Sequence, residues 1–320
     1  MGRIPSRAGP ILAGLSFLLA VISTVVDAAP GISTAARLLP VRFTAVDGFF
    51  EQSSVATNPR GYPAVPFALG LADKTDGRWN RAFAKLNALK KRVGKKGVVK
   101  MIFFQRHGQG THNVAVDTYG IKAWDEYYSK LPLYLDAPLT PLGTAQLANA
   151  TAIIASEIQS QLLPVPSLIA SSPLSRALNT TQLVWGTITH GQYHPRVYED
   201  LRETYGPYIC DQRHNRTELA LTYPDFTFSD LVNDADTLWN GVKPESDAHI
   251  EARVRSVLGA IMTTPASSTG NFTGPKVSDD LIGIVAHSGT IQFVTKIAGH
   301  RSWSVQPGGL LPMVIVGYYN

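Results

Sequence analysis

Cysteine is almost missing from this chain, which has a single one, Cys210, among 320 residues. One thiol cannot form an intramolecular disulfide, and it excludes zinc or iron–sulfur sites that need several thiolate ligands. The stability of the fold must therefore come from packing. With 44% hydrophobic and 17% charged residues, a chain of this length can bury a full core and is not expected to be disordered.

A strong excess of charge of one sign is also missing. Lysine and arginine number 29 against 24 acidic residues, which gives a formal net charge of +5. This density is far below that of nucleic-acid binders, so no nucleic-acid partner is expected. The most basic stretch, 85–100, has no aromatic residue from Lys90 to Lys100, and we interpret it as a solvated helix face and loop. Proteolytic processing after Arg92 stays open.

Long apolar runs are missing except at the N-terminus. Arg3 and Arg7 precede an apolar run over 11–26, and small residues surround Ala28. This pattern is typical of a secretory signal peptide, predicted over 1–28 and cleaved near Ala28. An uncleaved signal anchor is the alternative, but the run is shorter than the roughly 20 residues that span a bilayer. The protein is therefore expected to be secreted, without a membrane partner after cleavage.

Four Asn-x-Ser/Thr sequons would accept glycans if the chain enters the secretory pathway. They begin at Asn149, Asn179, Asn215 and Asn271. Asn271 lies in a stretch rich in Ser, Thr, Gly and Pro, which predicts a loop. It is the strongest candidate for a glycan.

The chain divides into an irregular N-terminal part and a regular remainder. Residues 29–97 are punctuated by Gly and Pro, and only 78–92 shows helical spacing of apolar residues. We interpret 29–97 as an extension that wraps around the core, and 98–320 as a catalytic domain. In the latter, strands are predicted over 98–104, 166–171, 196–198, 281–286 and 312–317, and helices over 142–162, 174–187, 247–263 and 289–298. The alternation predicts an α/β three-layer sandwich, with a mostly parallel sheet covered by helices on both faces.

Reactive side chains follow three of these predicted strands. Arg106 and His107 end the first, Arg176 comes shortly after the second, and His287 follows a later one. Carboxyl ends of parallel strands share one edge of a sheet, so these residues are expected to be neighbours. Arginine forks fit phosphoryl oxygens, and an imidazole can attack phosphorus. Gly108 and Gly110 are expected to let backbone N–H groups approach the same anion.

The ordered motifs resemble the histidine phosphatase superfamily, within its phosphoglycerate mutase-like branch of fungal and plant proteins. The set comprises Arg106-His107-Gly108, then Ser172-Pro173-Leu174-Ser175-Arg176, then Leu201-Arg202-Glu203, and finally Ala286-His287-Ser288-Gly289. Features before the first triplet also fit, so the resemblance covers about 45–320. It implies the phosphoglycerate mutase-like fold.

The resemblance also implies roles for five residues. His107 is the nucleophile that becomes phosphorylated, and Arg106 and Arg176 clamp the phosphoryl oxygens. His287 donates a hydrogen bond to these oxygens, and Glu203 is the general acid and base. The chemistry is compatible with these roles if His107 is neutral, which a bond from its Nδ1–H to a backbone carbonyl would arrange. Neither a metal nor another cofactor is expected, because the arginines and His287 supply the positive charge.

Further residues are candidates for contact with a small phosphorylated substrate. These are Gly108, Asn113, Arg202, Asp211, Arg213 and Ser288. Glu203 has acidic neighbours, and Glu199, Asp200 or Asp211 could face the site instead. Zinc binding by His107 and His112 is an alternative to the interpretation of His107 as a phosphorylated nucleophile, but no His-Glu-x-x-His helix supports it. Specificity is expected in the loops over 110–138 and 203–245.

The residues after the first triplet do not follow the forms typical of glycolytic mutases or of phytases. A secreted, metal-independent phosphomonoesterase is therefore the first hypothesis. Two alternatives stay open: a phosphomutase or other phosphate-handling enzyme on the same site, and a secreted protein that binds phosphorylated ligands without turnover.

Overall fold

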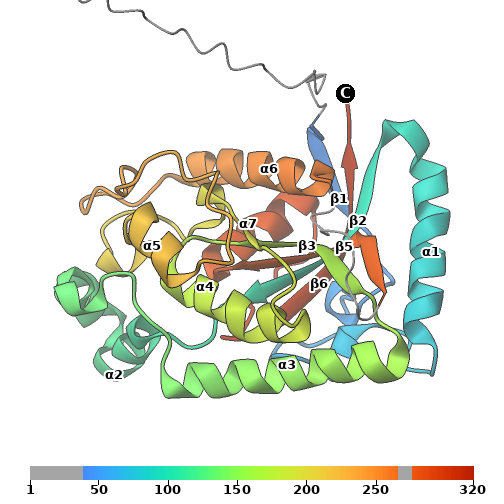
Figure 1. The fold of residues 1–320 in the computed structure, drawn as a ribbon, viewed down its shortest axis with the longest axis horizontal. Coiled ribbons are helices and arrows are strands. Elements are labelled where there is room, and N and C mark those ends of the chain that lie inside the picture. Colours follow the sequence, from blue (N-terminus) through green and yellow to red (C-terminus); the bar gives the residue numbers. More distant parts are fainter. Residues whose placement is uncertain (1–38, 266–275) are drawn as a thin grey trace, which may run out of the picture. The chain divides into compact units, whose positions relative to one another are not determined.

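A six-stranded sheet organises the computed structural model, which describes residues 39–265 and 276–320 (Figure 1). The strands are β1 (Arg42–Ala45), β2 (Gly97–Arg106), β3 (Val165–Ser171), β4 (Arg196–Val197), β5 (Val277–Ala286) and β6 (Leu310–Tyr318). Their order is β1-β6-β2-β5-β3-β4. Strands β2, β5, β3 and β4 run parallel, while β6 is antiparallel to both β1 and β2. The predicted α/β class with a mostly parallel sheet is confirmed.

Helices cover both faces of this sheet because alternate strand residues point to opposite sides. In β2, Met101 and Phe103 pack into one apolar cluster, and Ile102 and Phe104 pack into another. The first cluster includes residues of α1 (Arg78–Val93), α3 (Pro141–Gln161) and α4 (Ser175–Thr181). The second includes residues of α6 (Asp247–Thr263) and α7 (Ser288–Ala298). Figure 1 shows α3 and α6 on opposite sides of the strands.

The described part of the predicted extension joins the same core. Strand β1 extends the sheet beside β6, and Phe49, Leu69 and Trp79 are buried in the first cluster. A buried ion pair adds to this attachment, since Glu157 of α3 accepts two hydrogen bonds of 2.9 Å from Arg78 and one of 2.8 Å from Trp79. Residues 39–97 are thus packed as part of the domain.

Several helices and strands are not predicted from the sequence. These are β1, α2 (Thr111–Glu126) and α5 (Arg216–Thr222). The helix predicted over 174–187 is present as α4 and a π-helical turn (Gln182–Gly186) that continues it. Short 3₁₀ turns are Glu51–Ser53, Phe67–Gly70, Gly94–Lys96, Tyr128–Lys130, Pro132–Tyr134, Glu199–Leu201 and Ile209–Asp211. In α2 the periodicity is interrupted by Gly120, whose φ of 80° breaks the helix internally.

Three of the four sequons lie in the described residues. Asn149 is exposed on α3, and Asn215 is exposed at the N-terminus of α5. Asn179 is only half-buried on α4, but Thr181 of its sequon is buried and its hydroxyl donates to the Ala177 carbonyl. The predicted signal peptide over 1–28 and Asn271 lie outside the described residues. Within 39–265 and 276–320, no helix is both long and apolar enough to span a bilayer.

Candidate active site

The site forms where three neighbouring parallel strands end. In the register of β2 with β5, Arg106 is opposite Ala286, and in that of β3 with β5, Ser171 is opposite Val285. The first residue beyond β2 continues this pairing, because the His107 N–H donates to the Ala286 carbonyl at 3.1 Å. The topology thus brings together residues that are far apart in the sequence, as parallel strands do at their carboxyl edge.

His107 is buried, with 2% of its surface exposed, and its ring orientation is fixed. Nδ1 lies 2.7 Å from the carbonyl oxygen of Gly108, so Nδ1 carries the proton and donates it. Nε2 therefore carries the lone pair, and it lies 3.4 Å from Nε of Arg176. Burial lowers the pKa of His107 well below its ordinary value, and the charge of Arg176 acts in the same direction. A neutral imidazole with its lone pair on Nε2 is the form that can attack phosphorus.

Two more histidines surround this ring. The ring centroid of His287 lies 5.0 Å from that of His107, and the centroid of His112 lies 5.5 Å from it. His287 Nε2 is 2.7 Å from the Ser172 hydroxyl oxygen. Nδ1 of His287 and Nδ1 of His112 are buried without a hydrogen-bond partner among the described residues. Burial, followed by the charge of Arg176, lowers the pKa of both rings well below the ordinary value.

From the sequence, His112 is a candidate only as half of a zinc pair with His107. In the parts of the chain that the structure describes, no group of three or more His, Cys, Asp or Glu side chains is arranged to hold a metal ion. His112 instead lies in the first turn of α2 and borders the same cavity as His107. Its position five residues after His107, beyond a turn with two glycines, is the signal that could have identified it.

The two arginines are held by backbone carbonyl oxygens and a carboxylate. Arg176 is 1% exposed, and it donates from Nη1 to the Cys210 carbonyl at 2.6 Å and from Nη2 to Asp211 at 2.7 Å. These bonds leave its Nε directed at His107. Arg106 donates from Nη1 to the Val305 carbonyl at 3.0 Å, and its buried Nε has no partner in the described residues. Among the described residues, the Nε–H of Arg176 thus has only the distant Nε2 of His107 as an acceptor, and the Nε–H of Arg106 has none.

Two carboxyl groups border the cavity, Glu203 and Asp211. Glu203 accepts 3.0 Å hydrogen bonds from the backbone N–H groups of Thr204 and Gly289. Asp211 is 4% exposed, and burial raises its pKa to about 6, although the charge of Arg176 opposes the shift. Of the other acidic candidates, neither Glu199 nor Asp200 borders the cavity, within the described residues.

These side chains line a cavity of about 430 Å³. Its polar lining consists of Arg106, His107, His112, Asn113, Arg176, Glu203, Thr204, Asp211, Ser288 and Gln292. Of the predicted substrate contacts, Asn113, Asp211 and Ser288 border it. Asn113 also caps α2, because its side chain accepts from the Gly110 N–H at 2.9 Å. His287, Gly108, Arg202 and Arg213 are outside this lining.

The N–H groups of the glycines are already bonded within the protein. The Gly108 N–H donates to the Thr180 hydroxyl at 3.2 Å, and the Gly110 N–H donates to Asn113. The structure thus differs from the expectation that these N–H groups approach an anion. The side chains of Thr180 and Asn113 accept the hydrogen bonds from these N–H groups.

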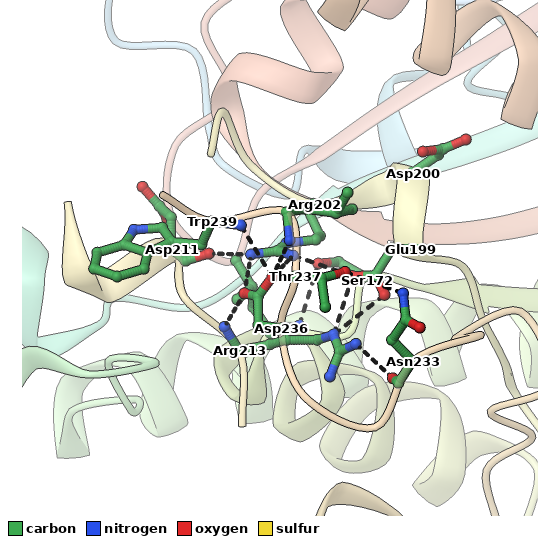
Figure 2. Close-up of polar contacts among 12 residues, drawn as sticks. Ser172, Glu199, Asp200, Arg202, Asp211, Arg213, Asn233, Asp236, Thr237 and Trp239 are labelled. Carbon is green, nitrogen blue, oxygen red and sulfur yellow. Dashed lines mark hydrogen bonds and ion pairs between the residues drawn. The ribbon is translucent and has the colours of Figure 1, made fainter. Parts of the chain in front are cut away.

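Arg202 and Arg213 belong to a buried ion network beside the cavity (Figure 2). Arg202 binds both oxygens of Asp236, at 2.8 and 2.6 Å, and also reaches Glu199 at 3.2 Å. Arg213 donates from Nε to both oxygens of Glu199 at 3.1 Å. The arrangement differs from the predicted substrate contacts because carboxylates more than ten residues away in sequence occupy both guanidinium groups. The network fixes the 233–239 segment against the site.

Comparison with known proteins bears on the whole domain. The family model of the histidine phosphatase superfamily (branch 1) matches residues 102–305. The chain belongs to this family. A probable phosphoglycerate mutase of Arthroderma benhamiae is 30% identical over 96% of this chain and 92% of that protein. Phosphomutase-like protein 3 of Candida albicans is 32% identical, covering 69% of this chain and 67% of its own length.

A plant protein is also similar to this chain. A phosphoglycerate mutase-like protein of Arabidopsis thaliana is 30% identical over 59% of this chain and 71% of that protein. The predicted resemblance to fungal and plant phosphoglycerate mutase-like proteins is thereby confirmed. Membership supports a phosphatase or phosphomutase activity.

Proposed function

We propose that this protein is a metal-independent phosphomonoesterase of the histidine acid phosphatase type, acting through a phosphohistidine on His107. The observation that carries the proposal is the orientation of that ring. Its Nδ1 proton is held by the Gly108 carbonyl, and Nε2 faces Arg176 at the cavity. A histidine that served only packing would not need a fixed tautomer beside two arginines.

The reaction proceeds in two balanced steps. Nε2 of His107 attacks the phosphorus of a phosphomonoester, the N–P bond forms, and the bond from phosphorus to the alcohol oxygen breaks. The leaving oxygen takes a proton from a carboxyl group, with Glu203 in that role. The ionised carboxylate then takes a proton from water as the water oxygen attacks phosphorus, and the N–P bond breaks. Arg106 and Arg176 bind the phosphoryl oxygens throughout.

Asp211 gives the site a second carboxyl group, which is protonated at mildly acidic pH. With a pKa raised to about 6 by burial, it keeps a proton where an ordinary aspartic acid would have lost it. When protonated it leaves more of the Arg176 charge available to phosphate. Activity is therefore expected to be greatest on the acidic side of neutrality.

Phosphate release from an aryl phosphate across about pH 4 to 8, with EDTA present, tests the proposal. We expect activity that survives EDTA and is lost in His107→Ala. His194→Ala is the matched control, because His194 is exposed and away from the cavity lining. A phosphoenzyme trapped by quenching in alkaline detergent, because the N–P bond of a phosphohistidine hydrolyses in acid, should form in the wild type and not in His107→Ala. Retained activity in His107→Ala, or loss of activity with EDTA, would overturn the proposal.

Phosphomutase activity is the second candidate, favoured by the names of the fungal relatives. A mutase passes the phosphoryl group from His107 to a second hydroxyl group instead of to water. Phosphorus NMR of the products separates the two reactions, because only hydrolysis yields inorganic phosphate in proportion to substrate consumed.

We also propose that residues 1–28 direct the chain into the secretory pathway. The basic start, the apolar run and the small residues near Ala28 support this. N-terminal sequencing of protein collected from the medium should begin at Ala29, and deglycosylation should lower its mass. Retention in the cell with an intact N-terminus would refute cleavage.

A further inference from the structure

The cavity changes character away from His107. In addition to the polar side chains, the cavity lining includes Val116, Ile121, Trp124, Pro207, Tyr208 and Pro244. Ile121 is 60% exposed and Pro244 is exposed, whereas His107 and Arg176 are almost fully buried. Apolar residues therefore line the mouth of the cavity, and the groups that bind the phosphoryl group line its floor.

This apolar wall is firmly built. The Trp124 ring packs edge-on against Tyr134, with centroids 5.2 Å apart, and against Tyr208 at 6.0 Å. The Tyr208 hydroxyl donates to Asp125 at 2.5 Å, which leaves its ring to face the cavity. Gly120 lies in α2 with a positive φ, and the turn it allows precedes Ile121 and Trp124. The wall is thus a preformed surface of rings and branched side chains.

No spare cation is available to recognise a second anionic group. In the described residues, Arg106 and Arg176 are the only arginines in the cavity lining, and no lysine lines it. Both are committed to the phosphoryl end. Arg202 and Arg213 are near in the chain, but Asp236 and Glu199 occupy them. Glu203 and Asp211 also border the cavity, and neither a carboxyl group nor a carboxylate offers positive charge to a carboxylate in the ligand.

We propose that the site selects phosphomonoesters whose alcohol portion is uncharged and apolar, aromatic ones included, over phosphorylated hydroxy acids. The proposal rests on the proposed function for its chemistry. A substrate carboxylate entering this cavity would lose its hydration without gaining a charged partner, whereas an apolar group would gain contact with the Trp124 and Tyr208 rings. The neutral side chains of Thr204 and Gln292 can bind a hydroxyl group but do not neutralise a carboxylate.

Binding of unreactive phosphonates to the full protein tests this selectivity without turnover. Butylphosphonate and 3-phosphonopropionate have similar lengths and differ in the terminal carboxylate. We expect calorimetry to give tighter binding of butylphosphonate by about tenfold or more, and still tighter binding of benzylphosphonate. Equal or tighter binding of 3-phosphonopropionate would overturn the proposal.

A variant with a matched control assigns the selectivity to the wall. Ile121→Lys places a cation at the mouth, and we expect it to reduce the preference against 3-phosphonopropionate by about tenfold. Leu221→Lys adds the same charge on α5, at a residue 79% exposed and outside the cavity lining. It should leave the preference unchanged. Equal effects of the two variants would mean that net charge alone sets the preference, which contradicts the proposal.

The substrates separate this failure from failure of the proposed function. If phenyl phosphate and 3-phosphoglycerate are hydrolysed equally well through His107, the selectivity is wrong and hydrolysis stands. If neither is hydrolysed but the phosphonates keep the expected order, hydrolysis is wrong and the apolar selectivity of the cavity stands.

Discussion

Alanine at Gly289 provides a test of Glu203 that leaves the carboxyl group itself in place. Gly289 is the second residue of α7, and its N–H donates to Glu203 Oε2 at 3.0 Å. The other carboxylate oxygen occupies the space that a Cβ at this position would need. Because the obstacle is the end of a flexible side chain, Gly289→Ala should move the Glu203 carboxylate and leave the backbone unchanged.

The size of the effect follows from the displacement. Ordinary contact with a Cβ begins near 3.4 Å, so the carboxylate must move by about 1 Å, and a misplacement of this size can lower the rate about 100-fold. The loss should depend on the leaving group. An alkoxide needs the proton that Glu203 supplies, whereas a nitrophenolate is stable enough to leave without it. Stability should rise slightly, because alanine favours a helix more than glycine does.

The assay compares kcat/KM for an alkyl phosphate and for nitrophenyl phosphate, because kcat/KM reports the transfer of the phosphoryl group to His107 and not the hydrolysis step that the two substrates share. We expect the alkyl substrate to lose about 100-fold and the nitrophenyl substrate to lose much less. Gly186→Ala is the matched control, since the nearest atom to its new Cβ is Gln182 Cγ at 3.9 Å. Equal losses on both substrates would show that the phosphoryl site itself is damaged. Full activity on both would refute the role assigned to Glu203.

Four further outcomes are expected. Burial raises the pKa of Asp211 to about 6, so we expect kcat/KM to fall as pH rises through that value, because ionised Asp211 offsets the Arg176 charge. Asp211→Asn should remove this fall from the pH profile. The raised pKa also means that the folded state holds the Asp211 proton more tightly than the unfolded chain does, so the stability that this proton contributes is lost as pH rises from about 4 to 6. Urea unfolding midpoints of the wild type and of Asp211→Asn across this pH range should show the loss in the wild type only. Glu157→Gln leaves Arg78 buried without its counter-ion and should lower the free energy of unfolding by about 3–5 kcal/mol in urea titrations; an unchanged midpoint would contradict this. Burial raises the pKa of the Cys210 thiol well above its ordinary value, so iodoacetamide should label it only after denaturation, and rapid labelling of the native protein would contradict the described burial.

The strands with continuous apolar runs could be predicted from the sequence, and β1 could not. The predicted strand over 98–104 lies inside β2, because a strand buried on both faces needs Val, Ile and Phe at successive positions. Strand β1 has only the four residues Arg42–Ala45, two of them exposed or nearly so, and its identity comes from pairing with β6. Long-range pairing of this kind leaves no local pattern.

The site divides in a similar way. Motifs at strand ends located Arg106, His107 and Arg176, because their order along the chain determines which strand each one follows. Arg202 has the same side chain, yet its partner Asp236 lies 34 residues away in the sequence. Whether an arginine meets substrate or a carboxylate depends on that distant partner, which residue type alone does not reveal.

The two ends of the sheet have a consequence for the behaviour of the folded protein in solution. An edge strand presents unpaired N–H and C=O groups that another chain can extend, which is a route to aggregation. Here the edge strands have four residues in β1 and two in β4, and the Thr227 backbone pairs with the outer side of β4. The longest apolar strands lie in the interior of the sheet. Within residues 39–265 and 276–320, concentrated native protein thus has little exposed strand from which intermolecular sheets could grow, and growth from this sheet should begin only after unfolding exposes the interior strands.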